Sequence, residues 1–563
     1  MKWRVLTKRK VAYIVAIVVL LVPVSLLSQP STVDSSGQRT TGGRLAELRE
    51  EHHLSQANLG EIDPASETIK LATLGMRGVA ANVLWHKATE YQKKEDWTSL
   101  SASLEQLTKL QPNVISFWHF QAWNLSYNVS VAFDNYRDRY QWVIKGIDFL
   151  KKGTQYNIGE PSLLWDIGWF TSQKIGRADE AKLYRKLFKE DYNRDNWLVG
   201  KEAFIAAQNA AENSRRSIQG VTRLGEKNRG MNPLLFQSDA PKCQINYAEA
   251  LEEDGTFGQV ARGEWDKAYA EWLAYGDRDI PTAYFNVVIR LNDQEKFEAR
   301  SKTAQAELAA LLPEGLADQI RQQRISQLSK QEQDALSTPP DQRTDEQKQI
   351  MAGVDSKLNL THFDLASEVQ GADRSKALAA ADAATQADSM AEIISIQRDI
   401  VNFQYWRERC EFERTPEAVE ARQNIFEAEQ ALADSDFERA GDKYDLGLAK
   451  WRAVLDQFPG LLQQTLVIED LQEMIGRYRE YLSHEDKELP NDFILRDVLE
   501  VEIPGQPVQV PPSSRPSDSG EQPKSDSAPD SSDPRPQSSP TDETPAPAAE
   551  AGESSASSGQ GAE

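Results

Sequence analysis

The sequence predicts an all-α protein, and the spacing of its apolar residues carries that prediction. From Ala81 to Asp195, small and apolar residues recur at steps of three and four positions, in three successive helix-turn-helix units. Further stripes with the same spacing return between Phe285 and about Glu500. Because a single helix pair cannot bury its apolar face alone, we expect the three units to stack as a solenoid. An unrelated helical bundle is the alternative.

The N-terminal segment predicts a transmembrane signal anchor. Residues 11–27 carry no charge and consist mostly of Val, Ile and Leu, and the basic flank at 1–10 holds five Lys or Arg side chains. An apolar run of 17 residues is just long enough to cross a bilayer, and a basic flank stays in the cytoplasm. We therefore expect a single-pass membrane protein whose bulk lies beyond the membrane. A cleavable signal peptide is the alternative, although Leu26, Leu27 and Ser28 form a poor cleavage site.

Composition divides the rest of the chain into six expected segments. The last of them is rich in Ser, Pro, Asp and Glu and has almost no large apolar residues, so we expect it to be disordered. The segments are a tether (28–64), a repeat domain (65–195), further helical repeats with a docking loop at 228–239 (196–284), long helical arms joined by a polar loop at 337–372 (285–405), a C-terminal helical domain (406–503) and an acidic tail (504–563).

The first repeat unit begins at Ala81 and is 34 residues long. Its apolar face combines three residues from each of two expected helices, namely Leu84, Ala88 and Tyr91, then Leu100, Leu104 and Leu107. The third unit begins at Ser162, with its turn at 176–181, and the unit between them, 115–161, holds about 13 extra residues. This length and pattern resemble a tetratricopeptide repeat. Weaker echoes occur at 263–268 and 435–440.

The resemblance to tetratricopeptide repeats implies a concave groove lined by the first helix of each unit. The side chains at its groove positions are Asn82, Trp85, Thr89 and Lys93 in the first unit, His119, Trp123 and Tyr127 in the second, and Asp166, Phe170 and Lys174 in the third. This mixture of aromatic, charged and hydrogen-bonding groups suits a protein or peptide partner better than a small molecule. The alternative is that Trp85, Trp123 and Phe170 are buried against neighbouring helices.

A closer resemblance rests on four runs of the chain. They are KLQPNVISFWHFQAWNLSYNVSVAFDNYRDRYQWVIKGIDFL (109–150), EPSLLWDIGWFTSQKIGRADEAKLYRKLF (160–188), RDNWLVGKEAF (194–204) and INYAEALEEDGTFGQVA (245–261). Together they resemble an uncharacterised family of membrane-anchored bacterial proteins of planctomycete type, which carries an iron-responsive label. The resemblance implies a place in the bacterial cytoplasmic membrane, and it supplies no activity.

The composition and the motifs that the chain lacks argue against several functions. A net charge of −23 repels phosphate backbones, so we expect no nucleic-acid partner. The chain has no phosphate-binding GxxxxGK[ST], no GxSxG nucleophile elbow and no HExxH zinc motif. We therefore expect a scaffold or adaptor that has no cofactor, no metal and no catalytic residue. An enzyme or metal-dependent envelope factor is the alternative, with a site built from scattered residues such as His86, His119 and Asp166.

Overall fold

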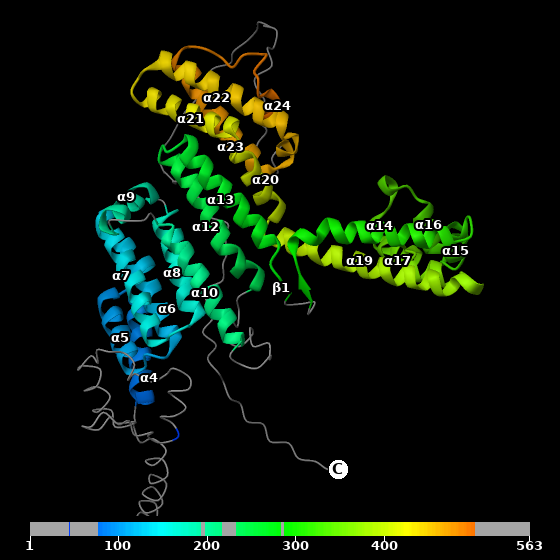
Figure 1. The fold of residues 1–563 in the computed structure, drawn as a ribbon, viewed down its shortest axis with the longest axis horizontal. Coiled ribbons are helices and arrows are strands. Elements are labelled where there is room, and N and C mark those ends of the chain that lie inside the picture. Colours follow the sequence, from blue (N-terminus) through cyan, green and yellow to red (C-terminus); the bar gives the residue numbers. More distant parts are fainter. Residues whose placement is uncertain are drawn as a thin grey trace, which may run out of the picture. The chain divides into compact units, whose positions relative to one another are not determined.

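The computed structural model describes residues 77–178, 180–192, 197–216, 232–282 and 287–501, together with Arg44. In these residues the fold is helical, with one two-stranded antiparallel hairpin, which confirms the all-α prediction (Figure 1). The predicted anchor and tail, and the tether apart from Arg44, lie outside the described residues. Among the described residues, no helix combines the length and apolar character needed to cross a membrane.

The N-terminal block begins with two helix pairs at the first two expected repeat units, whereas the two helices of the third expected unit do not pair with each other. Asp96 caps the second helix, because its side chain accepts a hydrogen bond from the backbone N–H of Ser99, and Pro161 opens α8 at a position that needs no N–H. Helix α4 packs on α5, and α6 on α7. The elements are α4 (Arg77–Lys93), α5 (Trp97–Leu110), α6 (Ile115–Trp123), η2 (Asn124–Val129), η3 (Ser130–Ala132), α7 (Tyr136–Tyr156), α8 (Pro161–Trp169), η4 (Phe170–Ile175), α9 (Ala181–Tyr192) and α10 (Val199–Arg216).

Two of these elements are π-helices, which the periodicity did not predict. η2 follows α6 directly, and η4 follows α8 directly, so both continue the first helix of a unit. π-helices are rare and are frequent at functional sites. The extra length of the second unit is taken up by η2, η3 and the 21-residue helix α7.

A glycine allows the close approach of α8 and α10. A Cβ atom added at Gly168 would lie 2.7 Å from Cδ1 of Phe204. In consequence α10 covers much of α8, while α9 contacts η4 and α7.

The middle block holds a helix pair and a long hairpin. α12 packs on α13, and the arms α14 and α19 run side by side (Figure 1). The elements are α12 (Pro233–Glu253), α13 (Gly258–Gly276), β1 (Ile280–Pro281), β2 (Val288–Ile289), η5 (Leu291–Asp293), α14 (Gln294–Leu311), α15 (Leu316–Ser326), α16 (Lys330–Ser337), η6 (Pro340–Gln342), α17 (Asp345–Leu358), α18 (His362–Ser367), η7 (Gly371–Asp373) and α19 (Arg374–Ile400).

Two predicted loops in this block are wrong. The expected docking loop at 228–239 is helical from Pro233 onward, because Asn232 caps α12 and Pro233 occupies its first turn. The expected polar loop at 337–372 contains α17 and α18, each of which begins with a capping box. Small apolar cores form beneath these short helices, around Val354 in one case and around Ala366 and Ala381 in the other.

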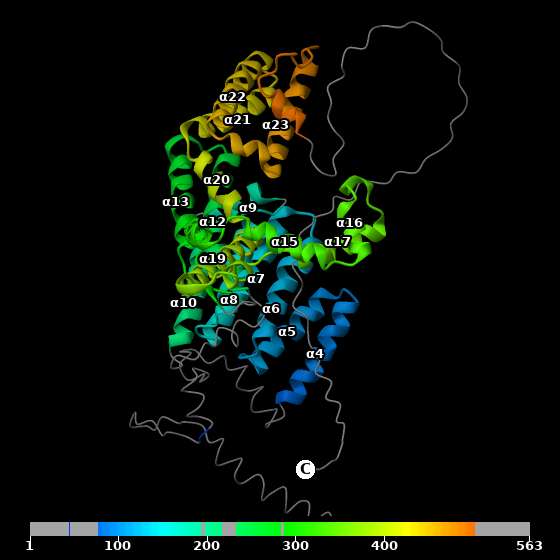
Figure 2. The same ribbon diagram turned by 90° about the vertical axis from the view of Figure 1, so that its right-hand side faces the viewer.

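The C-terminal block is a bundle in which α21 and α22 lie side by side (Figure 2). Its core is built around large buried side chains, among them Phe412, Tyr444 and Leu471. The elements are α20 (Phe403–Glu413), α21 (Pro416–Ala433), α22 (Phe437–Gln457), η8 (Pro459–Gln463), α23 (Thr465–His484) and α24 (Arg496–Glu500).

One turn geometry recurs in three helix hairpins. Between α4 and α5, α12 and α13, and α21 and α22, a residue with positive φ ends the first helix: Glu95, Gly255 and Ser435. The next residue donates its backbone N–H to a carbonyl five positions earlier, at 2.7–3.0 Å. This is the Schellman closure of a helix end. The echo at 435–440 lies at such a turn, whereas the echo at 263–268 lies inside α13.

Candidate functional site

The groove residues predicted in the first unit lie on α4 and have mixed exposure. Asn82 and Lys93 are exposed, while Trp85 and Thr89 are half-buried. The Thr89 hydroxyl donates to the carbonyl of Trp85 at 3.0 Å. The Trp85 ring lies 5.4 Å from the rings of both Phe117 and Phe120 on α6. Trp85 therefore joins the first unit to the second.

Predicted groove residues of the second and third units meet in one cluster at the two π-helices. The Trp123 ring stacks on the Tyr127 ring, with centroids 3.8 Å apart and planes 8° apart. The Lys174 ammonium lies 3.9 Å from the centroid of the same tyrosine ring. Because Trp123 covers one face of that ring so closely, the ammonium takes the other face. Phe170 meets the Tyr127 ring edge-on at 5.5 Å. We call Trp123, Tyr127, Phe170 and Lys174 the Trp123 cluster.

Members of the Trp123 cluster differ sharply in exposure. Trp123 keeps 47% of its surface exposed, and Tyr127 and Lys174 are half-buried. Phe170 is only 3% exposed, so the prediction that it lines a groove is wrong. Its ring instead supports Tyr127 from inside the protein, in the core that also holds Trp118. The cluster therefore offers one tryptophan face to solvent on a rigid base.

His119 and Asp166 form an ion pair between α6 and α8. The Nδ1 atom of His119 contacts a carboxylate oxygen of Asp166, and both side chains are partly buried. Burial lowers the pKa of His119, but the hydrogen bond and the charge of Asp166 outweigh that effect, so its pKa lies above the ordinary value. The pair fixes the two helices that continue into η2 and η4.

A metal site at His86, His119 and Asp166 finds no support in the described residues. His86 is exposed on α4, whereas His119 and Asp166 pair with each other. Within the described ranges, no three His, Cys, Asp or Glu side chains are grouped so that they could hold a metal ion.

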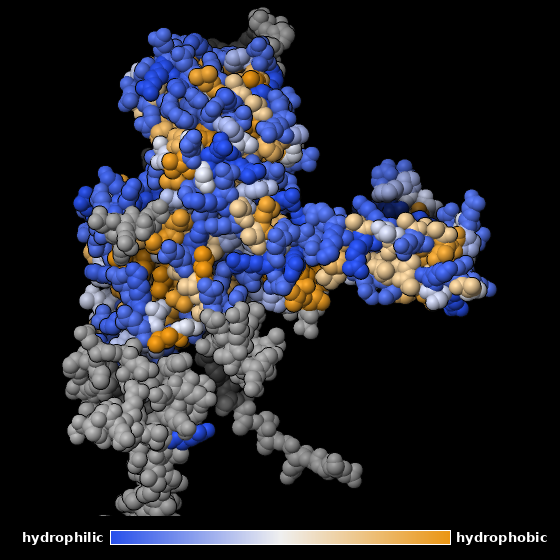
Figure 3. Space-filling view, in the orientation of Figure 1, coloured by the Kyte–Doolittle hydropathy of each residue, from blue (hydrophilic) through white to orange (hydrophobic). Residues whose placement is uncertain are grey.

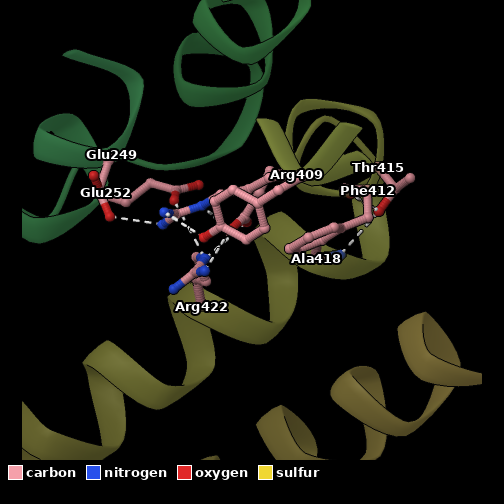
Figure 4. A network of polar contacts seen from close by, with 9 residues as sticks. Glu249, Glu252, Arg409, Phe412, Thr415, Ala418 and Arg422 are labelled. Carbon is pink, nitrogen blue, oxygen red and sulfur yellow. Dashed lines mark hydrogen bonds and ion pairs between the residues drawn. The ribbon is translucent and has the colours of Figure 1, made fainter. Parts of the chain in front are cut away.

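The sequence did not predict a charged cleft, which has a volume of about 790 Å³. Its walls come from α9 and the turn before it, and from α12, α20, α21, α22 and α23. Arg409 of α20 donates to Glu249 of α12 at 2.6 Å. Arg422 of α21 donates through Nε to Glu413 of α20 at 2.7 Å and through a second nitrogen to the same carboxylate. Figure 4 shows the α12 carboxylates facing these two guanidinium groups.

Glu252 is the carboxylate in this network with the weakest contact to a cation. Its side chain is 6% exposed, and its Oε2 atom lies 3.6 Å from Nε of Arg422. Its Oε1 atom has no hydrogen-bond partner among the described residues. Burial and the charge of Glu413 raise the pKa of Glu252 to about 8, while Arg422 acts in the opposite direction. Glu252 is therefore mostly protonated at neutral pH.

The other acids and bases of the cleft are shifted by the same neighbours. Burial raises the pKa of Glu249, but the charges of Arg409 and Arg177 lower it by more. Its pKa therefore lies below the ordinary value. Burial lowers the pKa of Arg409, and the surrounding carboxylates, led by Glu249, more than compensate. Asp470 has a raised pKa because of its burial.

The cleft was missed because its charges are far apart in the chain. Glu249 and Arg409 are separated by 160 positions, and each lies in a stretch that reads as a solvated helical face. The run WRERCEFER at 406–414, which mixes Arg and Glu with Trp406 and Phe412, was the available signal. Such a run places charges and large rings on all sides of one helix, which a purely surface helix does not need.

No protein-family model matches the chain, and no curated protein matches it either.

Proposed function

We propose that the protein is a membrane-anchored adaptor of a bacterial envelope, which binds a partner protein through the Trp123 cluster and catalyses no reaction. In this proposal the apolar run at 11–27 anchors the chain, and the helix pairs form a tetratricopeptide-like scaffold. The recurring Schellman closure of three hairpins supports a scaffold of repeated helix pairs.

The stacked geometry of Trp123 carries the proposal. Trp123 exposes 47% of its surface, so it presents a large apolar group to water. Its ring lies flat against the ring of Tyr127, with the ring centroids 3.8 Å apart. Aromatic anchors of this kind dominate binding energy at protein interfaces, and a rigid ring loses little entropy when a partner covers it. Apolar side chains also gather on the face over α8 and α10 (Figure 3).

Capture from membranes of the native organism tests this proposal. We expect Trp123→Ala to weaken retention of a partner at least about fivefold, the change that corresponds to about 1 kcal/mol at an interface anchor. Leu446→Ala is the matched control, because Leu446 is 52% exposed on α22 in the C-terminal bundle. If quantitative mass spectrometry finds the same proteins in equal amounts with wild type and W123A, the cluster is not the binding surface.

A further inference from the structure

Two buried side-chain amides flank Trp123 in the sequence. Gln121 lies on α6, and Asn124 is the first residue of η2. Both side chains belong to residues with 0% of their surface exposed. Helices α5 and α7 pack against α6 and η2. The two amides therefore lie in the interior of the repeat block, while Trp123 between them points outward.

Most of the polar atoms of these two amides are not satisfied by the described residues. Oε1 and Nε2 of Gln121 and Nδ2 of Asn124 are buried and have no hydrogen-bond partner in the described part of the chain. The remaining atom, Oδ1 of Asn124, accepts a hydrogen bond from Nδ2 of Asn128 at 3.2 Å. One acceptor and two donor groups are thus left over in the core.

Such groups call for a ligand that both donates and accepts hydrogen bonds. Buried polar atoms in folded proteins are nearly always paired, and an internal water is the usual partner where the protein supplies none. Residues three positions apart on a helix have their Cβ atoms about 5–6 Å apart. One water spans that gap, because it forms hydrogen bonds of about 2.8 Å on each side. It can donate to Oε1 of Gln121 and accept from Nδ2 of Asn124.

The surroundings of the two amides are polar and closely packed. Ser126 and Ser130 are buried as well, and their hydroxyls donate to the carbonyls of Val143 and Ser126 at 3.4 and 2.7 Å. Helix α7 comes so close that a Cβ atom added at Gly146 would lie 2.9 Å from the carbonyl oxygen of Ala122. Polar walls and close packing favour water over a larger or an apolar ligand.

We propose that an ordered water is bound between Gln121 and Asn124 and is part of the joint between α6 and η2. Because Asn124 begins η2, this water supports from the interior the segment that carries Tyr127. The inference does not depend on the proposed adaptor function, since no partner takes part in it.

A high-resolution crystal structure of the full-length protein tests the site directly. We expect an ordered water within about 2.7–3.2 Å of both Oε1 of Gln121 and Nδ2 of Asn124. Well-defined density for both side chains with a water at only one of them, or at neither, would overturn the proposal.

The melting temperature of Gln121→Met in the full-length protein gives an independent test, because wet and dry amides predict opposite signs. Methionine keeps the length of the side chain and removes the amide. In a dry core that change removes an unpaired polar group, so the melting temperature should rise. With a bridging water it strands Nδ2 of Asn124, so we expect the melting temperature to fall by about 2 °C or more. A rise, or no change, would contradict the proposal.

The double variant with Asn124→Leu shows whether one water serves both amides. A shared water is lost with the first substitution, so each change should lower the melting temperature less in the double variant than alone. Gln208→Met is the matched control, because the buried Gln208 amide donates to the carbonyl of Phe236 at 3.0 Å and accepts from Arg278 at 2.8 Å. Its effect should add to that of Asn124→Leu, whereas additive effects of Q121M and N124L would refute a shared water. The wild-type crystal structure keeps the test valid if a variant fails to fold.

Discussion

At the scale of single residues, the environment of Glu252 decides its chemistry. In the unfolded chain the pKa of a glutamate is about 4.3, whereas in the folded protein the pKa of Glu252 is about 8. Between these two pH values Glu252 ionises in the unfolded chain but stays protonated in the folded protein. Ionisation therefore stabilises the unfolded state over this pH range. The stability that Glu252 contributes is fully present below about pH 4.3 and is lost as the pH rises to about 8.

We predict that Glu252→Gln stabilises the protein at pH 8, by an amount on the order of a few kcal/mol, and has little effect near pH 4. Glutamine keeps the shape of the protonated acid and cannot ionise in the unfolded chain. Urea unfolding followed by circular dichroism between pH 4 and pH 9 measures the effect. Glu473→Gln is the control, because Glu473 is exposed and pairs with Arg477 on its own helix at 2.7 Å. It should follow the wild-type profile, and an E252Q profile parallel to wild type would refute the prediction.

At the scale of elements, the contact of α8 with α10 depends on the absence of one methyl group. Gly168 faces the ring of Phe204, and this rigid ring has no flexible end that could bend away from an added methyl group. Gly476 on α23 has no atom within 4 Å of an added Cβ. The two glycines are both helical, so they separate the packing effect of a methyl group from its effect on helix propensity.

We predict that Gly168→Ala destabilises the protein by about 1–3 kcal/mol through overpacking, while Gly476→Ala is neutral or stabilising by up to about 1 kcal/mol. The melting temperature from scanning calorimetry should therefore fall in G168A and hold or rise in G476A. Equal shifts in both variants would mean that α8 and α10 can separate without loss.

The helices of the repeat units could be predicted from periodicity, whereas several other elements could not. The spacing of Leu100, Leu104 and Leu107 is helical, and all three are fully buried. Within 337–372, α18 is short, but the 14-residue α17 buries Met351, Val354 and Leu358 at steps of three and four positions. This stripe and the capping boxes that start with Thr344 and Thr361 were both readable in the sequence. The π-helices leave no such signal, because one inserted residue changes no composition.

At the scale of the whole described chain, buried charges tie α12 to the C-terminal bundle. Arg409 donates to Glu249 at 2.6 Å and lies 3.8 Å from Glu413, whose side chain is fully buried. A single sequence cannot pair residues so far apart, because each charge suits a surface position equally well. For the same reason, residues of the Trp123 cluster could be proposed from repeat positions, while those of the cleft could not.

We predict that Arg409→Met destabilises the protein by about 3–5 kcal/mol, because it leaves Glu249 and Glu413 buried without this cation. Arg290→Met is the matched control, since Arg290 pairs with Asp279 on the surface and both are more than half exposed. That change should cost less than about 1 kcal/mol. Chemical denaturation of the two variants compares them directly, and equal losses would show that the buried network contributes nothing special.

The two π-helices also set the direction of the side chains within them. An α-helix advances by about 100° per residue, and a π-turn holds one residue more than an α-turn. Tyr127 lies inside η2 and Lys174 inside η4, so their meeting depends on that shifted phase. Loss of a single residue from either segment would return it to α-helical winding, which changes the direction of side chains inside the segment while the helix beyond it keeps its phase. A change in length of one residue, rather than any substitution, is therefore the smallest step by which descendants of this chain could redirect the surface.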